Sequence, residues 1–270
     1  MPRRTPPGRL RDVARSACRV FIEKGYRRAL LTDVGKDLGL SHGLLYRYVE
    51  SKEALFELAL VYAMDPEAIS AVPVPLATPP KGRALDLVRA WAADRARFPL
   101  LEAAARDDAG DTAAELAGIV GECYAFVERN RRVLALIERS AFDIPELYDF
   151  YFGGLRAAYI SQLAGYLWRR TEAGLLRPVP DAIAAARFIT ESIAWFGWHR
   201  KADPGSSMIS DEQARQTVRE LLLAAFVCSS DDATTASAAS ELPGTHTRGG
   251  VVPPASHLRE FLRASSSHAR

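Results

Sequence analysis

Apolar residues recur at helical spacing along most of this 270-residue chain. In the first such stretch, residues 8–25, the apolar positions lie three or four residues apart and arginines fill the other faces. These apolar positions are Leu10, Val13, Ala14, Ala17 and Phe21. No segment shows the strict alternation, bounded by hairpin residues, that a half-buried strand requires. The pattern therefore predicts an all-α protein.

Capping residues, glycines and prolines divide this pattern into about nine to ten helices. Ser41 and Ser51 are good first caps, Gly25, Gly39 and Gly174 are plausible stops, and Ser210 with Gln213 forms a capping box. The expected helices cover residues 8–25, 33–38, 42–48, 52–64, 81–97, 99–107, 112–140, 145–173, 180–201 and 210–228.

Composition marks the expected domain boundaries. Residues 65–80 contain five prolines, through which a helix does not continue. From Ser229 onward Ser, Ala, Thr, Asp, Gly and Pro dominate, a composition typical of disorder. We therefore expect a small helical domain with its connector helix over 1–64, a proline-rich loop over 65–80, a larger helical domain over 81–228 and a disordered tail over 229–270.

Charge is distributed unevenly between these regions. The chain has 35 basic and 33 acidic residues, a net charge of +2. Residues 1–52 hold 12 of the basic residues and 5 of the acidic ones, a local net charge of +7, so the rest of the chain is mildly acidic. This asymmetry indicates a polyanionic partner for the N-terminal domain alone.

Several functional classes find no support in the sequence. The three cysteines, Cys18, Cys123 and Cys228, and the five histidines are too scattered for a zinc site or a disulfide framework. No catalytic motif or phosphate-binding glycine loop is present. The longest purely apolar run, residues 221–228, is too short to cross a bilayer. We expect a cytoplasmic protein with no membrane partner, metal, cofactor or catalytic residues, and therefore no enzyme.

Residues 32–48 have the layout of a helix-turn-helix, two short helices joined by a glycine-containing turn. Gly39 suits the turn because it tolerates a left-handed backbone. One side of the second helix carries leucines for a core. The other carries small residues, hydroxyls and a guanidinium that suit phosphates and base edges: His42, Gly43, Leu44, Tyr46, Arg47 and Tyr48.

The stretch TDVGKDLGLSHGLLYRYVESKEAL, residues 32–55, resembles the helix-turn-helix signature of TetR-family transcriptional regulators. Matching positions are Thr32, Gly39, Ser41, Tyr46, Lys52, Glu53 and Leu55, and Gly43 and Leu45 also fit. The departures are Gly35 and Leu38 in place of alanine, Leu40 in place of valine and Val49 in place of phenylalanine. The resemblance is specific over about residues 8–64. Beyond them only the helical layout and length agree.

This resemblance implies a homodimeric regulator, by family default a repressor, that a small-molecule effector releases from a palindromic operator in double-stranded DNA. Phosphate contacts are expected from Thr32, Ser41, Tyr46 and Lys52. Base or groove contacts are expected from His42, Gly43, Leu44 and Arg47, and Tyr48 could serve either set. The family's dimer helices would be residues 180–201 and 210–228, with candidate interface residues Ile193, Phe196, Leu222 and Phe226.

Aromatic residues in the larger domain are candidates for an effector pocket, although core packing is favoured for each of them taken singly. They include Trp91, Tyr124, Phe126, Tyr159 and Trp168, together with Tyr166. We expect Cys123 to be buried and unreactive, because the sequence places no base beside it. Two other functional classes stay open: an effector-independent activator or architectural DNA-binding factor, and a helical enzyme fused to a basic domain.

Overall fold

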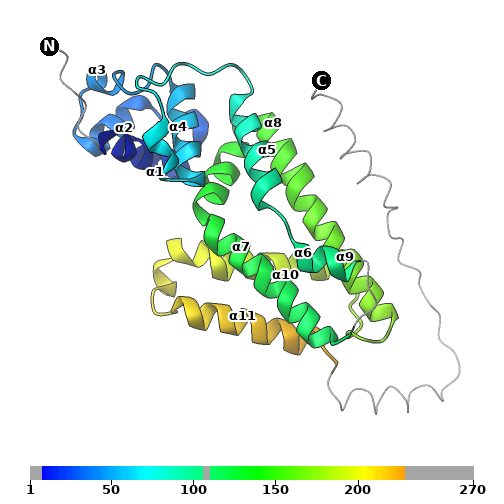
Figure 1. Cartoon of the computed structure of the whole chain (residues 1–270). Coiled ribbons are helices and arrows are strands. Elements are labelled where there is room, and N and C mark those ends of the chain that lie inside the picture. Colours follow the sequence, from blue (N-terminus) through cyan, green and yellow to red (C-terminus); the bar gives the residue numbers. More distant parts are fainter. Residues whose placement is uncertain (1–7, 106–109, 229–270) are drawn as a thin grey trace, which may run out of the picture. The chain divides into compact units, whose positions relative to one another are not determined.

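A computed structural model describes residues 8–105 and 110–228 (Figure 1). The expected tail, residues 229–270, lies outside the described residues. The α-helices are α1 Arg9–Arg28, α2 Leu31–Leu38, α3 His42–Leu45, α4 Lys52–Met64, α5 Arg83–Arg95, α6 Pro99–Ala104, α7 Thr112–Ala141, α8 Pro145–Tyr148, α9 Ala157–Glu172, α10 Ala182–Gly197 and α11 Asp211–Phe226.

The all-α prediction is confirmed. Over the described ranges, β-pairing is limited to two isolated bridges, Val49 with Leu76 and Leu176 with Val227. None of the described helices combines the length and the apolar character that crossing a bilayer requires.

Several predicted helices end differently in the structure. The first, expected to stop at Gly25, continues to Arg28 across a kink at that glycine. The helix expected over 42–48 stops at Leu45, and residues 46–48 form a turn. The helix expected over 145–173 consists of α8, a π-helical stretch Asp149–Arg156 and α9, and the π-helical stretch contains the helix-weakening pair Gly153–Gly154. The helix expected over 180–201 ends as α10 at Gly197, and a 3₁₀ turn His199–Ala202 follows.

The chain packs into two compact units. The first contains the described residues up to Arg97 together with Arg129–Gly153, and the second contains Phe98–Glu128 and the described residues from Gly154 onward. Helix α7 contributes its first half to the second unit and its second half to the first. Packing therefore groups the proline-rich loop, α5 and the end of α7 with the N-terminal helices.

An aromatic group closes the core of the first unit. Phe21 of α1 meets Phe56 of α4 edge to face at 5.0 Å, and Tyr26 contacts Phe56 at the same distance. Both phenylalanines are buried. Helix α1 also packs on α2, and α2 packs on α3. Side-chain burial in the first unit thus fixes α1, α2, α3 and α4 relative to one another.

The core of the second unit lies between α7, α9, α10 and α11. It is largely apolar, but one arginine enters it. Arg170 is almost fully buried and forms two parallel hydrogen bonds to Glu115, of 2.9 and 3.0 Å. A bidentate pair of this kind compensates much of the cost of taking a guanidinium out of water.

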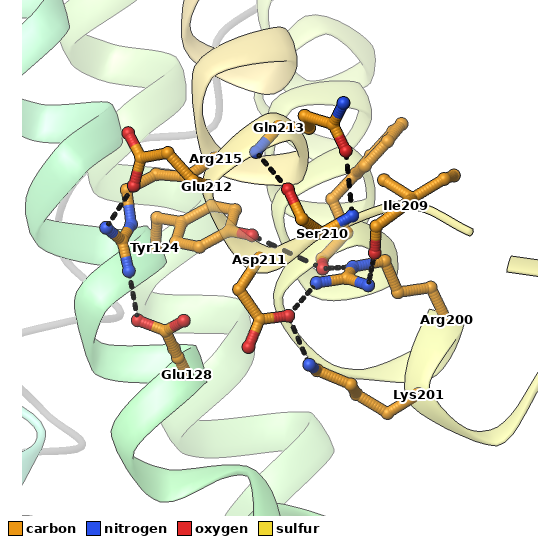
Figure 2. A network of polar contacts seen from close by, with 11 residues as sticks. Tyr124, Glu128, Arg200, Lys201, Ile209, Ser210, Asp211, Glu212, Gln213 and Arg215 are labelled. Carbon is orange, nitrogen blue, oxygen red and sulfur yellow. Dashed lines mark hydrogen bonds and ion pairs between the residues drawn. The ribbon is translucent and has the colours of Figure 1, made fainter. Parts of the chain in front are cut away.

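A second buried arginine holds the connection between α10 and α11 (Figure 2). The Arg200 guanidinium donates to the carbonyl oxygens of Phe196 at 2.7 Å and Ile209 at 2.8 Å, and it also pairs with Asp211. Lys201 pairs with the same carboxylate, and these two cations lower the pKa of Asp211 through hydrogen bonds and charge. Arg200 therefore satisfies carbonyls at the end of α10 and in the following loop.

We expect Arg200→Met to destabilise the protein by about 2–4 kcal/mol, because the Phe196 and Ile209 carbonyls and the Asp211 carboxylate each lose one donor. Urea denaturation followed by circular dichroism measures this loss. Asp94→Asn is the control, since it removes an exposed pair with Arg95 and should change stability by about 0.5 kcal/mol or less. Equal stability of the Arg200 variant and the wild type would contradict the role assigned to this residue.

Candidate nucleic-acid interface

The turn between α2 and α3 depends on glycine, as the sequence predicts. Gly39 follows α2 with a φ of 64°, in the left-handed region. The next amide, Leu40 N–H, donates to the Gly35 carbonyl at 2.8 Å. The Ser41 carbonyl then accepts from the amides of Leu44 at 3.0 Å and Leu45 at 3.3 Å, which starts α3.

Side chains along α3 and the turn after it divide between core and solvent. Leu45 and Val49 are fully buried, whereas Gly43 and Arg47 are exposed and Tyr46 is 44% exposed. Leu44 is half-buried. His42 is the first residue of α3. In this exposed surface the guanidinium of Arg47 and the phenol of Tyr46 lie beside Gly43. Because Gly43 has no side chain, a duplex can approach the backbone closely there.

Tyr48 requires a correction. The sequence analysis places it on the outer face as a possible DNA contact, but the structure leaves only 5% of it exposed. The reason is that the helix ends at Leu45, so Tyr48 falls in the turn that packs back onto the core. Its ring is a structural element of the first unit and no candidate for base contact.

The residues expected to contact phosphates differ in their exposure and in their partners. Thr32 and Ser41 are exposed near the starts of α2 and α3. Thr32 is the second residue of α2, whose cap is Leu30. Lys52, in contrast, donates to the Arg27 carbonyl at 2.9 Å and lies 4.9 Å from the centre of the Tyr26 ring. Partial burial lowers the Lys52 pKa, and this lysine therefore ties α4 to α1 in the structure.

Ion pairs within the first unit offset much of the positive charge of α1. Arg11 pairs with Glu67 at 2.7 Å, Arg15 with Asp12 at 2.9 Å, and Arg19 with Asp37. Hydrogen bonds from Ser16 and Arg19 lower the pKa of Asp37. The arginines thus have partners before any DNA arrives, which favours a solvated, paired face over a bare phosphate-binding face.

Lys36 is a candidate that the sequence analysis missed. It lies four residues after Thr32 on α2, and both residues are exposed. Residues four apart share one face of a helix, so the lysine continues the surface that starts at Thr32. The helical spacing from Thr32 could have identified it.

The candidate pocket aromatics are only partly brought together. Tyr124 and Tyr159 are buried in the core of the second unit, and Phe126 packs against the same core. Tyr166 is buried there as well, whereas Trp168 is exposed on α9, and Trp91 is buried in the first unit. Phe98 is a member that the sequence analysis missed, with its ring 4.4 Å from Tyr159 and 5.1 Å from Phe126.

The tyrosine and cysteine beside this aromatic group have unusual surroundings. The Tyr159 hydroxyl is buried and makes no hydrogen bond of ordinary geometry with the described residues, and its interacting neighbour is the Cys123 thiol. Burial raises the pKa of Tyr159 well above its ordinary value and the pKa of Cys123 to about 12. At neutral pH Cys123 is therefore a buried thiol rather than a reactive thiolate, in line with the expectation from its sequence context.

The candidate dimer residues lie mostly inside a single protomer. Ile193, Leu222 and Phe226 belong to the buried core of the second unit, and Phe196 packs against that core. A fully buried side chain does not contact a second chain. The exposed apolar residues of the same helices are different ones: Ile183, Phe188 and Trp195 on α10 and Leu221 on α11.

A cleft of about 670 Å³ lies in the first unit, and the sequence analysis did not anticipate it. Tyr26 and Phe56 line it from α1 and α4, residues 79–85 line it from the end of the proline-rich loop and the start of α5, and Ile144 and Glu146 complete it. No cluster of three potential metal ligands occurs anywhere in the described ranges.

The comparisons with known proteins agree on the family. Residues 14–59 match the model of the bacterial regulatory proteins of the tetR family. Curated proteins give no match to the chain. Among solved structures, the ketosteroid transcriptional regulator KstR2 of Mycobacterium tuberculosis is 17% identical, with 83% of this chain and 98% of that chain covered and a TM-score of 0.51.

Two further solved structures share less of the geometry. AibR in complex with isovaleryl coenzyme A and operator DNA is 18% identical, with 80% of this chain and 98% of that chain covered and a TM-score of 0.46. NalD, the secondary repressor of the MexAB-OprM multidrug efflux pump in Pseudomonas aeruginosa, is 17% identical, with 81% and 97% covered and a TM-score of 0.43.

The family match covers α2, α3 and most of α1 and α4, where the turn at Gly39 and the exposed surface of α3 lie. Residues 14–59, the helix-turn-helix region of this chain, thus match the N-terminal model of the tetR family of bacterial regulatory proteins.

Proposed function

We propose that this protein is a homodimeric repressor that a small-molecule effector releases from a palindromic operator. The observation that carries the proposal is the surface of α3 and the turn after it, where Gly43, Tyr46 and Arg47 are exposed beside a buried Leu45. Such a surface fits the major groove, with Arg47 directed at base edges and Tyr46, Ser41 and Thr32 at phosphates. Lys36 joins the phosphate contacts.

Arg47 is the residue on which this docking can be tested. We expect Arg47→Ala to weaken binding to the preferred duplex about tenfold to a hundredfold and to reduce discrimination against other sequences. Selection from random duplexes, followed by footprinting near the protein's own promoter, first supplies the operator. Fluorescence anisotropy then measures both affinities at several salt concentrations.

Arg95→Ala is the matched control for this experiment, because it removes the same charge from an exposed position on α5. Its operator affinity should stay within about twofold of wild type. Unchanged discrimination in the Arg47 variant would mean that this side chain reads no base, and unchanged affinity as well would remove α3 from the interface.

Dimerisation through α10 and α11 would supply the second half-site. The helices pack on each other, and their exposed apolar residues include Phe188 at 59% and Leu221 at 63% exposure. Phe188 and Trp195 lie seven residues apart, on one face of α10. A two-fold interface would cover these side chains and place the two α3 segments about 34–36 Å apart, one helical turn of DNA.

Light scattering tests the proposed interface. Phe188→Glu should convert the dimer to a monomer at micromolar concentration, because the change places a charge in an apolar contact. Met208→Glu is the control, since Met208 is 86% exposed and lies outside both helices. A Phe188→Glu protein that stays dimeric would show that α10 pairs through another surface.

The buried hydroxyl of Tyr159 supports a polar contact with an effector. It belongs to an aromatic group with Phe98 and Phe126, and a buried hydroxyl without a partner costs about 1–3 kcal/mol. An effector with an apolar body and one hydrogen-bonding atom near this ring would recover that cost. Binding energy that differs between two conformations would then shift the distance between the α3 segments.

Tyr159→Phe provides a test that needs no effector. In the ligand-free protein the variant should be as stable as wild type or more stable by up to about 1 kcal/mol, because no hydrogen bond is lost. Urea denaturation measures the difference. Once a thermal-shift screen has identified an effector, the variant should bind it less tightly. A loss of more than about 1 kcal/mol without effector would mean that the hydroxyl is already satisfied.

A further inference from the structure

The proline-rich segment after α4 contacts the residues that follow α3. We call residues 72–80 the strap. The Leu76 amide donates to the Tyr48 carbonyl at 2.8 Å, and the Glu50 amide donates to the Leu76 carbonyl at 3.0 Å. The Thr78 amide donates to the Glu50 carboxylate at 3.1 Å. Three hydrogen bonds therefore join the strap to Tyr48 and Glu50, which follow directly after Tyr46 and Arg47 in the chain.

These bonds take the place of helical hydrogen bonds beyond Tyr48. In a continuing helix the Tyr48 carbonyl would accept from an amide four residues later, but here it accepts from Leu76. The amides of Arg47 and Tyr48 bond instead to the carbonyls of Leu44 and Leu45, three residues back. The strap thus replaces the next helical turn, and Tyr48 and Val49 are buried at this point.

Both ends of the strap are anchored. Before it, the 3₁₀ turn Ala68–Ala71 packs on α1 and α4, with Ile69 buried. After it, α5 begins at Arg83, whose guanidinium pairs with Glu57 of α4 at 2.9 Å. Prolines 73, 75, 79 and 80 occupy four of the nine positions of the strap. Proline fixes φ, so the segment transmits displacement rather than absorbing it.

We propose that the strap is a positioning element for Tyr46 and Arg47, and that α5 acts on these residues through it. The proposal rests on the proposed docking of α3 in a DNA groove. Helix α4 is the other connection, since it begins two residues after Glu50. The first turn of α4 is held to α1 by Lys52, and the end of the strap borders the 670 Å³ cleft.

The positioning role is tested with a pair of variants at Glu50. Glu50→Ala removes the acceptor of the Thr78 amide, whereas Glu50→Gln keeps an acceptor oxygen, and both remove the same charge. We expect amides 46–50 to exchange hydrogen about five- to tenfold faster in the alanine variant than in the glutamine variant. Discrimination between operator and random duplex should fall about three- to tenfold in the alanine variant alone.

Equal exchange rates and equal discrimination in the two Glu50 variants would overturn the positioning role. The exchange measurement uses the free protein, so it separates the strap from the docking. A wild type that binds no duplex in preference to others would refute the proposed function. A difference in exchange between the two Glu50 variants would still support the positioning role of the strap.

The link to α5 is tested by inserting two glycines between Ala77 and Thr78. Coupling between two sites is reciprocal, so operator binding must act back on α5 if α5 acts on the recognition segment. We expect operator DNA to slow amide exchange in residues 83–86 about threefold or more in wild type and to leave it unchanged in the lengthened protein. Ala77→Gly with Thr78→Gly, which keeps the length, should retain the response.

A response that persists in the lengthened protein would mean that the coupling runs through α4, and the proposal would fail. A wild type without any response in residues 83–86 on operator binding would refute it as well. Because the insertion lies in an exposed segment, circular dichroism and urea denaturation should show a folded protein with wild-type helix content.

Discussion

The proposed DNA-binding surface depends on the burial of Leu45, Tyr48 and Val49 beside the exposed residues Tyr46 and Arg47. Apolar burial of this kind is worth roughly 1.5–3 kcal/mol for each large side chain, far more than a surface ion pair contributes. It holds the backbone of residues 45–49 against the first unit. Tyr46 and Arg47 are then directed outward by the geometry of the segment and need no ion pair of their own to hold that direction.

Backbone hydrogen bonds complete what burial begins. Residues 46–50 belong to no regular helix, so their polar groups require partners elsewhere. The carbonyls of α3 and the Leu76 peptide supply them. A loop distant in sequence is therefore part of the proposed DNA-binding element, and it lies outside the match to the family at residues 14–59.

Two buried arginines give the second unit its polar framework. Arg170 is compensated by Glu115 within the core, and Arg200 by carbonyl oxygens and Asp211 at the connection of α10 and α11 (Figure 2). Buried guanidinium groups of this kind demand specific geometry, because each N–H needs an acceptor. Arg200 restricts how α10 and α11 lie, and these helices carry the exposed apolar residues Phe188 and Leu221.

The sequence by itself determined the helical class, most helix boundaries and the turn at Gly39, because periodicity, caps and glycine act locally. It also identified Leu45 as core and Arg47 as exposed. Only the tertiary structure decided that Tyr48 is buried, that Ile193, Leu222 and Phe226 lie within one protomer, and that Leu76 bonds to Tyr48. These features depend on partners distant in the chain, and an apolar residue has the same sequence signature whether its partner lies in its own core or in a second protein.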